Sequence, residues 1–86
     1  MAVNPLNFLI ELTNSTTLTL DAVKHGLSYS KVGDCIDFDD WQALYHSVNI
    51  AEVREISSNL RNKYEKQYYE LGRPRTAEEW YSALYA

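Results

Sequence analysis

The sequence is poor in cysteine, glycine and proline: it has one, three and two of them in 86 residues. Because Cys35 is the only cysteine, no internal disulfide can form, and a lone thiol suits a reducing compartment such as the cytosol. No apolar run approaches the roughly 20 residues that a membrane span needs. The first twelve residues lack the basic segment of a signal peptide. We therefore expect a cytoplasmic protein that does not insert into a membrane.

The sequence also lacks the residue patterns that catalysis or metal binding requires. His25 and His46 are the only histidines, and Cys35 lies between them at no spacing typical of zinc ligands. A dyad of Cys35 with a histidine would need a third, orienting group, and none is evident. The three glycines are isolated, so there is no phosphate-binding loop. These absences predict a protein that is not an enzyme and that has no cofactor and no metal.

The composition predicts one small globular domain, residues 1–86. Hydrophobic residues make up 45% of the chain, and a chain of this length buries only about 60% of its unfolded surface. The net charge is −4, and residues 1–50 hold six acids and two bases, whereas residues 51–86 hold six of each. Acidic proteins are repelled by phosphate backbones, which argues against nucleic acid as a direct ligand.

The clearest expected element is a long central helix at about residues 50–71. Asn49 is a good N-cap, and Glu52 follows at the spacing of a capping box. Gly72 suits the left-handed residue after a helix, and Pro74 prevents continuation. The apolar residues of this segment are spaced three or four positions apart, which places them on one stripe of a helix. They are Ile50, Val53, Ile56, Leu60, Tyr64, Tyr68 and Leu71.

Three further helices are indicated by their first residues. Thr76 with Glu79 forms a second capping box for a last helix. Asp37 is the expected N-cap of a helix with an apolar stripe at Phe38, Trp41, Leu44, Tyr45 and Val48. A first helix is expected at Asn4, with Pro5 at its first position. We therefore predict an all-α fold, a small bundle of four to five helices.

Residues 14–36 allow two interpretations. Thr19 or Asp21 could begin a short helix through His25 that Gly26 closes. Residues 17–20 and 27–32 also alternate between apolar and polar side chains, as strands do. We prefer the helix; the alternative is an α+β fold with a small sheet within residues 14–36.

One segment resembles the helix-turn-helix signature of DNA-binding regulators. The resemblance is carried by Ala22, Gly26, Leu27, Ser28, Ser30 and Val32. It implies a turn at the glycine and a recognition helix capped by a serine. Asp21 and His25 depart from the pattern, and residues 33–37 are acidic where phosphate contacts need Lys or Arg. We prefer a helix that ends at Gly26, followed by a capped turn.

An acidic cluster precedes the central helix and comprises Asp34, Asp37, Asp39 and Asp40. A calcium loop would need a mid-loop glycine and a closing glutamate, which this segment lacks. The preferred interpretation is that these carboxylates favour the positive end of a helix dipole. The alternative is that they engage a basic groove on a partner protein.

Four other residues are candidates for contact with a partner. Tyr69 lies nearly opposite the apolar stripe of the central helix, and Tyr85 lies near the end of the last helix. Tyrosine and arginine are frequent in protein interfaces. Arg54 and Arg61 flank one edge of the stripe, although Arg61 could simply pair with Glu65 along the helix.

These features predict a small acidic, non-enzymatic protein-binding module. It would act by covering a surface of a larger protein or protein complex, as an inhibitor or adaptor. Phage-encoded inhibitors of host machinery, anti-CRISPR proteins among them, and small assembly factors offer an analogy of size and composition alone. One alternative is a helix-turn-helix-like DNA-binding regulator. A second alternative is a small oligomeric structural or assembly protein, because an uncovered aromatic stripe promotes self-association.

Overall fold

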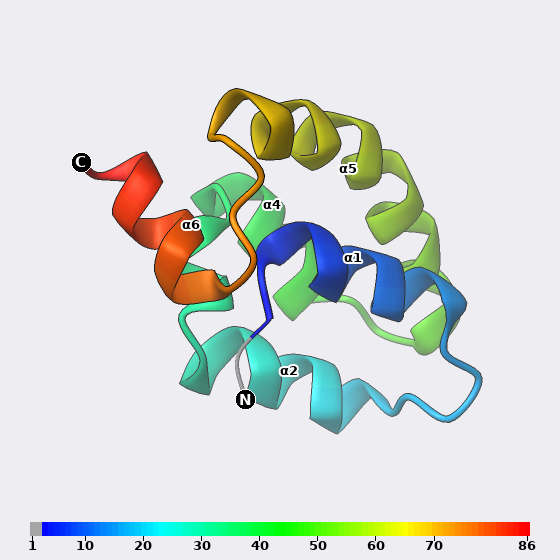
Figure 1. Cartoon of the computed structure of the whole chain (residues 1–86). Helices are drawn as coiled ribbons and strands as arrows, with labels where there is room; N and C mark the ends of the chain where they lie inside the picture. The colour runs from blue at the N-terminus through cyan, green and yellow to red at the C-terminus, as the bar shows by residue number, and fades with distance from the viewer. Residues whose placement is uncertain (1–2) are drawn as a thin grey trace.

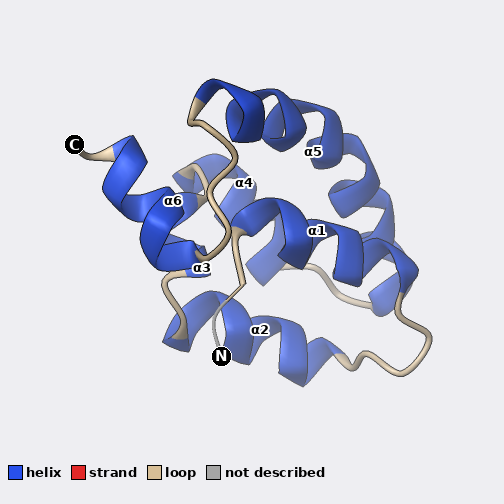
Figure 2. Cartoon of the chain, viewed as in Figure 1, coloured by secondary structure: helices blue, strands red, loops and turns tan. Residues whose placement is uncertain are grey.

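A computed structural model describes residues 3–86; Met1 and Ala2, which belong to the expected domain 1–86, lie outside the described residues. In this part of the chain, helices joined by loops are the only regular secondary structure (Figures 1 and 2). The helices are α1 (Pro5–Asn14), α2 (Leu20–Tyr29), α3 (Val32–Cys35), α4 (Phe38–Tyr45), α5 (Ile50–Glu70) and α6 (Ala77–Leu84). The all-α expectation is confirmed. The alternative of a small sheet within residues 14–36 is wrong.

Helix α5 is the expected long central helix. The Asn49 side chain accepts a hydrogen bond from the Glu52 N–H at 2.8 Å, so the predicted cap forms. Gly72 has a φ of 83° and Arg73 a φ of 60°, so the chain leaves the helix through two left-handed residues. The Arg73 N–H donates to the Tyr68 carbonyl at 2.9 Å and satisfies one of the last carbonyls of the helix.

Helix α1 pairs with α5, and hydrogen bonds at both ends fix its direction. At one end, Asn4 Nδ2 donates to the Pro74 carbonyl at 2.6 Å. At the other end, Arg54 Nη2 donates to the Ser15 carbonyl at 2.6 Å. Because the start of α1 meets the segment after α5 and the end of α1 meets the first turns of α5, the two helices are antiparallel (Figure 1).

Helix α2 corrects the expectation that a helix ends at Gly26. It begins after Thr19, one of the two predicted starts, and continues to Tyr29, so Gly26 lies in its interior. A Cβ at Gly26 would lie 3.0 Å from the ring of Phe8 on α1, so the glycine permits close contact between the helices. The turn that the helix-turn-helix resemblance implies at Gly26 is therefore not formed, and the next helix, α3, has four residues.

The core draws buried side chains from every described helix. Its largest members are Trp80 of α6 and Tyr64 of α5, both fully buried. The Trp80 ring centroid lies 6.5 Å from that of Tyr64 and 6.2 Å from that of Tyr68. Aromatic packing therefore holds the last helix against the central one.

The Tyr64 hydroxyl connects α5 to the start of α4. It accepts a hydrogen bond from the Asp37 N–H at 2.8 Å and donates one to Asp40 Oδ2 at 3.0 Å. Burial raises the pKa of Tyr64, so the phenol stays protonated at neutral pH. The buried hydroxyl thus serves as a fixed donor and acceptor between the two helices.

The variant Tyr64→Phe should lower the free energy of unfolding by about 1–3 kcal/mol, because it leaves a backbone N–H without its partner. Urea denaturation followed by circular dichroism measures this. Tyr69→Phe, at a side chain that is 57% exposed, is the matched control and should change stability by less than about 0.5 kcal/mol. Equal effects of the two variants would contradict a structural role for the Tyr64 hydroxyl.

Candidate functional site

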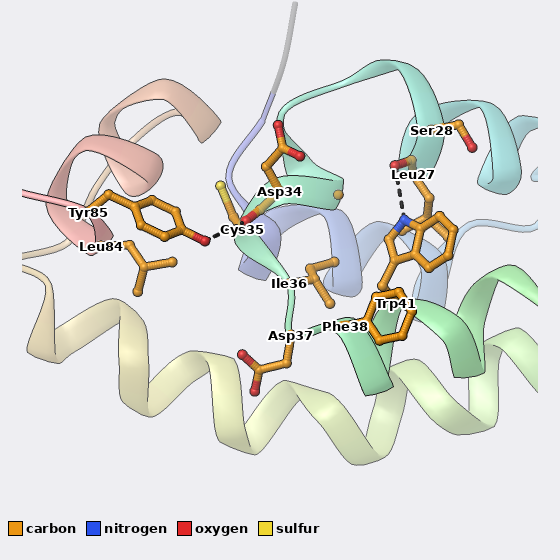
Figure 3. A pocket seen from close by; sticks show the side chains of 11 residues that line it. Leu27, Ser28, Asp34, Cys35, Ile36, Asp37, Phe38, Trp41, Leu84 and Tyr85 are labelled. Carbon is orange, nitrogen blue, oxygen red and sulfur yellow. Dashed lines mark hydrogen bonds between the residues drawn. The ribbon is translucent and has the colours of Figure 1, made fainter.

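A surface groove of about 650 Å³ is formed by α2, α3, α4 and the C-terminal end of α6 (Figure 3). Its apolar lining comprises Leu27, Ile36, Phe38, Trp41 and Leu84, and its polar lining includes Asp34, Asp37 and Tyr85. We call this feature the α3 groove. In Figure 3, Ile36 lies at its centre, with Tyr85 on one side and Phe38 and Trp41 on the other. The groove combines aromatic walls with carboxylates at its rim.

The wall on the α4 side is an ordered aromatic stack. Trp41 Nε1 donates to the Leu27 carbonyl at 3.2 Å, which fixes the indole to the end of α2. The indole stacks on Phe38, with ring centroids 6.1 Å apart, and on Tyr45 at 4.5 Å. Phe38 is nevertheless 67% exposed. An apolar ring is therefore held at the groove mouth in a defined place.

The opposite wall is Tyr85, just after α6. Its hydroxyl donates to the Asp34 carbonyl at 3.3 Å, which links the end of α6 to α3. Its ring centroid lies 4.6 Å from that of Tyr81, and Tyr85 is 63% exposed. A second aromatic surface therefore faces the groove at a position set by packing and a hydrogen bond.

The floor of the groove depends on Gly33. A Cβ at this position would overlap the Leu27 carbonyl oxygen, the same oxygen that accepts the Trp41 hydrogen bond. Only a residue without a side chain lets α3 approach the end of α2 this closely. Gly33 and Trp41 thus meet at one backbone carbonyl, which joins α2, α3 and α4 beside the groove.

The acidic cluster divides into two kinds of carboxylate. Lys63 of α5 bonds to Asp37 and, at 2.7 Å, to Asp40, so these two acids are partly neutralised. The hydrogen bonds to Asp37 and then to Asp40 raise the pKa of Lys63, which keeps it charged. Within residues 3–86, Asp34 and Asp39 make no ion pair, and both are exposed.

Asp37 also corrects the expected helix cap. It occupies the N-cap position of α4, but its side chain makes no capping hydrogen bond. Its carboxylate bonds to Lys63 instead. The sequence pattern identified the start of the helix correctly and assigned the carboxylate to the wrong partner, because Lys63 is distant in the sequence.

The other predicted partner contacts lie outside the α3 groove. Arg54 is bonded to the Ser15 carbonyl and serves the α1–α5 pairing. Arg61 is partly buried on α5. Tyr69 is exposed, and the Arg73 guanidinium lies 5.4 Å from its ring centroid. The groove therefore brings together Asp34, Asp37 and Tyr85 from the predicted set, and leaves the rest elsewhere.

Phe38 and Trp41 are the groove residues that sequence reasoning missed. Their helical spacing assigned both to a core stripe, whereas Phe38 is exposed and Trp41 only partly buried. The available signal was their position directly beside Asp37, since aromatics interleaved with acids suit a surface more than a core.

The groove lining includes one thiol, and its environment disfavours the reactive thiolate form. Cys35 is buried, and its Sγ lies 3.5 Å from the Ala77 carbonyl oxygen, to which the thiol donates. Burial, followed by the charges of Asp34 and Glu78, raises the pKa of the thiol from 9.0 to about 11. Across the described chain, no three acidic, histidine or cysteine side chains gather as metal ligands would.

None of the helices in residues 3–86 has the length and apolar character needed to cross a membrane. Comparisons with protein-family models, with curated proteins and with solved structures found no match to this chain.

The variant Gly33→Ala should destabilise the fold by about 1–3 kcal/mol, because α3 must move away from the Leu27 carbonyl. Thermal unfolding and Trp41 fluorescence measure the loss of stability and the change in the groove. Gly26→Ala is the control: its new methyl meets the edge of a movable ring, and alanine favours the helix by about 1 kcal/mol. A Gly33→Ala protein as stable as wild type would contradict this account of the groove.

The Cys35 thiol should resist modification in the folded protein. Raising its pKa from 9.0 to about 11 lowers the thiolate fraction at pH 8 by about 100-fold, and burial slows access further. Reaction with Ellman's reagent, with and without concentrated urea, measures the difference, and the folded-state rate should rise as the pH approaches 11. Equally fast labelling in the two states at pH 8 would show that the thiol is accessible and ionised.

Proposed function

We propose that this protein is a small, non-enzymatic protein-binding module that covers a surface of a larger partner through the α3 groove. The observation that carries the proposal is the pair of exposed aromatic rings, Phe38 and Tyr85, on opposite sides of a groove with carboxylates at its rim. Exposed aromatics in a concave, partly apolar site are typical anchors of protein interfaces.

The walls of the groove favour binding because they are already ordered. The hydrogen bond from Trp41 to the Leu27 carbonyl and that from Tyr85 to the Asp34 carbonyl hold each wall in place. Immobilising a side chain on binding costs about 0.5–1.5 kcal/mol, so ordered walls reduce that cost. The groove offers no activated thiol nucleophile, since burial raises the pKa of Cys35 and keeps it protonated at neutral pH.

The proposed partner is a protein or protein complex with a basic surface. The charged residues that line the groove are Asp34 and Asp37, both acidic, and complementary charge selects the partner. The net charge of −4 disfavours nucleic acid. The proposal includes a cytoplasmic setting, which the single unpaired cysteine supports. Inhibitor and adaptor roles both fit a module of this kind, including the phage-encoded type.

A site-specific photo-cross-link tests the proposal. Phe38 is replaced by p-benzoyl-phenylalanine, and the protein is irradiated in lysate of its natural source. We expect one predominant cross-linked protein, because position 38 lies at the mouth of the groove. The same replacement at Val48, which is also exposed, at 74%, and lies outside the groove lining, should not give that product.

Competition identifies the surface that binds. Excess unlabelled wild-type chain should suppress the cross-link, and the Phe38→Ala chain should compete less well, whereas Val48→Ala should compete like wild type. A cross-link between two copies of this chain would instead support the oligomeric assembly protein, an alternative that the exposed Tyr29, Tyr69 and Tyr81 favour. The same product from positions 38 and 48 would refute binding through the groove.

A further inference from the structure

The α3 groove has the chemistry to receive one basic side chain. Its floor at Ile36 is apolar and buried, and its two sides are aromatic. In Figure 3 the carboxylates of Asp34 and Asp37 lie on opposite sides of Ile36, along the direction not occupied by the aromatic walls. An apolar floor, aromatic sides and an unpaired carboxylate, Asp34, at one end match a side chain with an aliphatic stem and a cationic head.

We propose that the partner's anchor in this groove is an arginine side chain. Its stem packs on Ile36 between Phe38 and Tyr85, and its guanidinium faces Asp34. The inference rests on the proposed function and adds to it the chemistry of the residue that is recognised. Arginine fits better than lysine because a planar guanidinium stacks on aromatic faces and is more weakly hydrated than an ammonium group.

The charges around the groove support a cationic occupant. The Asp34 carboxylate makes no ion pair within the described residues. Asp37 is already paired with Lys63, so Asp34 is the groove carboxylate that is left for a second cation. Lys31, the nearest base along the chain, has its ammonium group 5.7 Å from the centroid of the Tyr81 ring, which does not line the groove.

A second surface groove has a different charge pattern. It lies beside residues 72–75 and is lined by two bases, Arg73 and Arg75, and two acids, Glu78 and Glu79. Its charges cancel, and the Glu79 carboxylate already accepts a hydrogen bond from the Arg75 N–H at 2.7 Å. This groove has no preference for a cation and provides an internal control for binding experiments.

Two blocked pentapeptides that differ only at their centre test the inference. One carries arginine and the other carries citrulline, which has nearly the same shape and no charge. Each is titrated into the isotope-labelled full chain, and amide and indole signals are followed by NMR. We expect the arginine peptide to shift the signals of Ile36, Phe38 and Trp41 and to bind about three- to five-fold more tightly than the citrulline peptide, as expected for an exposed charge pair.

Charge-removal variants locate the cation. Asp34→Asn should lower the affinity for the arginine peptide about three- to five-fold. Asp39→Asn removes the same charge from an exposed residue that does not line the groove, and it should change the affinity less than about two-fold. The Asp34 carboxylate makes no hydrogen bond within residues 3–86, so Asp34→Asn keeps the fold, which the same spectra verify.

Three results would overturn the inference: equal affinity of the two peptides, shifts confined to residues 72–75, or no groove shifts with peptide on the order of millimolar concentration. If any of these results were obtained while the cross-link at position 38 remained specific, the protein-binding function would stand, and only the arginine anchor would be rejected. Loss of the cross-link, with arginine binding retained, would remove the protein-binding function and leave the basic-residue site.

Discussion

The antiparallel pairing of α1 with α5 is the constraint on which the other helices depend. A side chain clamps each end: Asn4 bonds to the Pro74 carbonyl, and Arg54 bonds to the Ser15 carbonyl. Both acceptors are backbone atoms outside the helices, so the clamps also fix where the chain enters α2 and α6. The close contact of Phe8 with Gly26 then places α2 against α1. The α3 groove is built on that frame, from segments that do not belong to the pair.

Sequence reasoning succeeded where structure is decided by neighbouring residues. Asn49 and Thr76 were predicted as N-caps, and each side chain accepts the expected backbone hydrogen bond. It failed where a distant residue decides the outcome. Gly26 suggested the end of a helix, but the helix continues through it, and the glycine lies in close contact with Phe8 on another helix. A glycine that resembles a helix end in the sequence can therefore mark a close contact between two helices instead.

In the candidate site, too, properties of single residues could be predicted, whereas contacts between distant residues could not. Asp34, Asp37 and Tyr85 could be selected individually, from charge and from aromatic character, because those properties belong to single residues. Their convergence on one groove follows from the hydrogen bond of the Tyr85 hydroxyl to the Asp34 carbonyl, which joins segments far apart in the chain. No periodicity within either segment predicts that bond. Arg54, selected on the same grounds, is instead committed to the α1 clamp.

The sharing of Lys63 between Asp37 and Asp40 has a consequence for how a partner would be encountered. One lysine offsets part of the charge of two carboxylates, so the field around the acidic cluster is weaker than four aspartates suggest. At physiological ionic strength that field decays within about 8 Å. Association with a basic partner would then be steered less strongly than four aspartates suggest, and its rate would lie closer to the unsteered value of about 10⁵–10⁶ M⁻¹ s⁻¹. The lifetime of the complex, governed by short-range contact in the groove, would set its affinity.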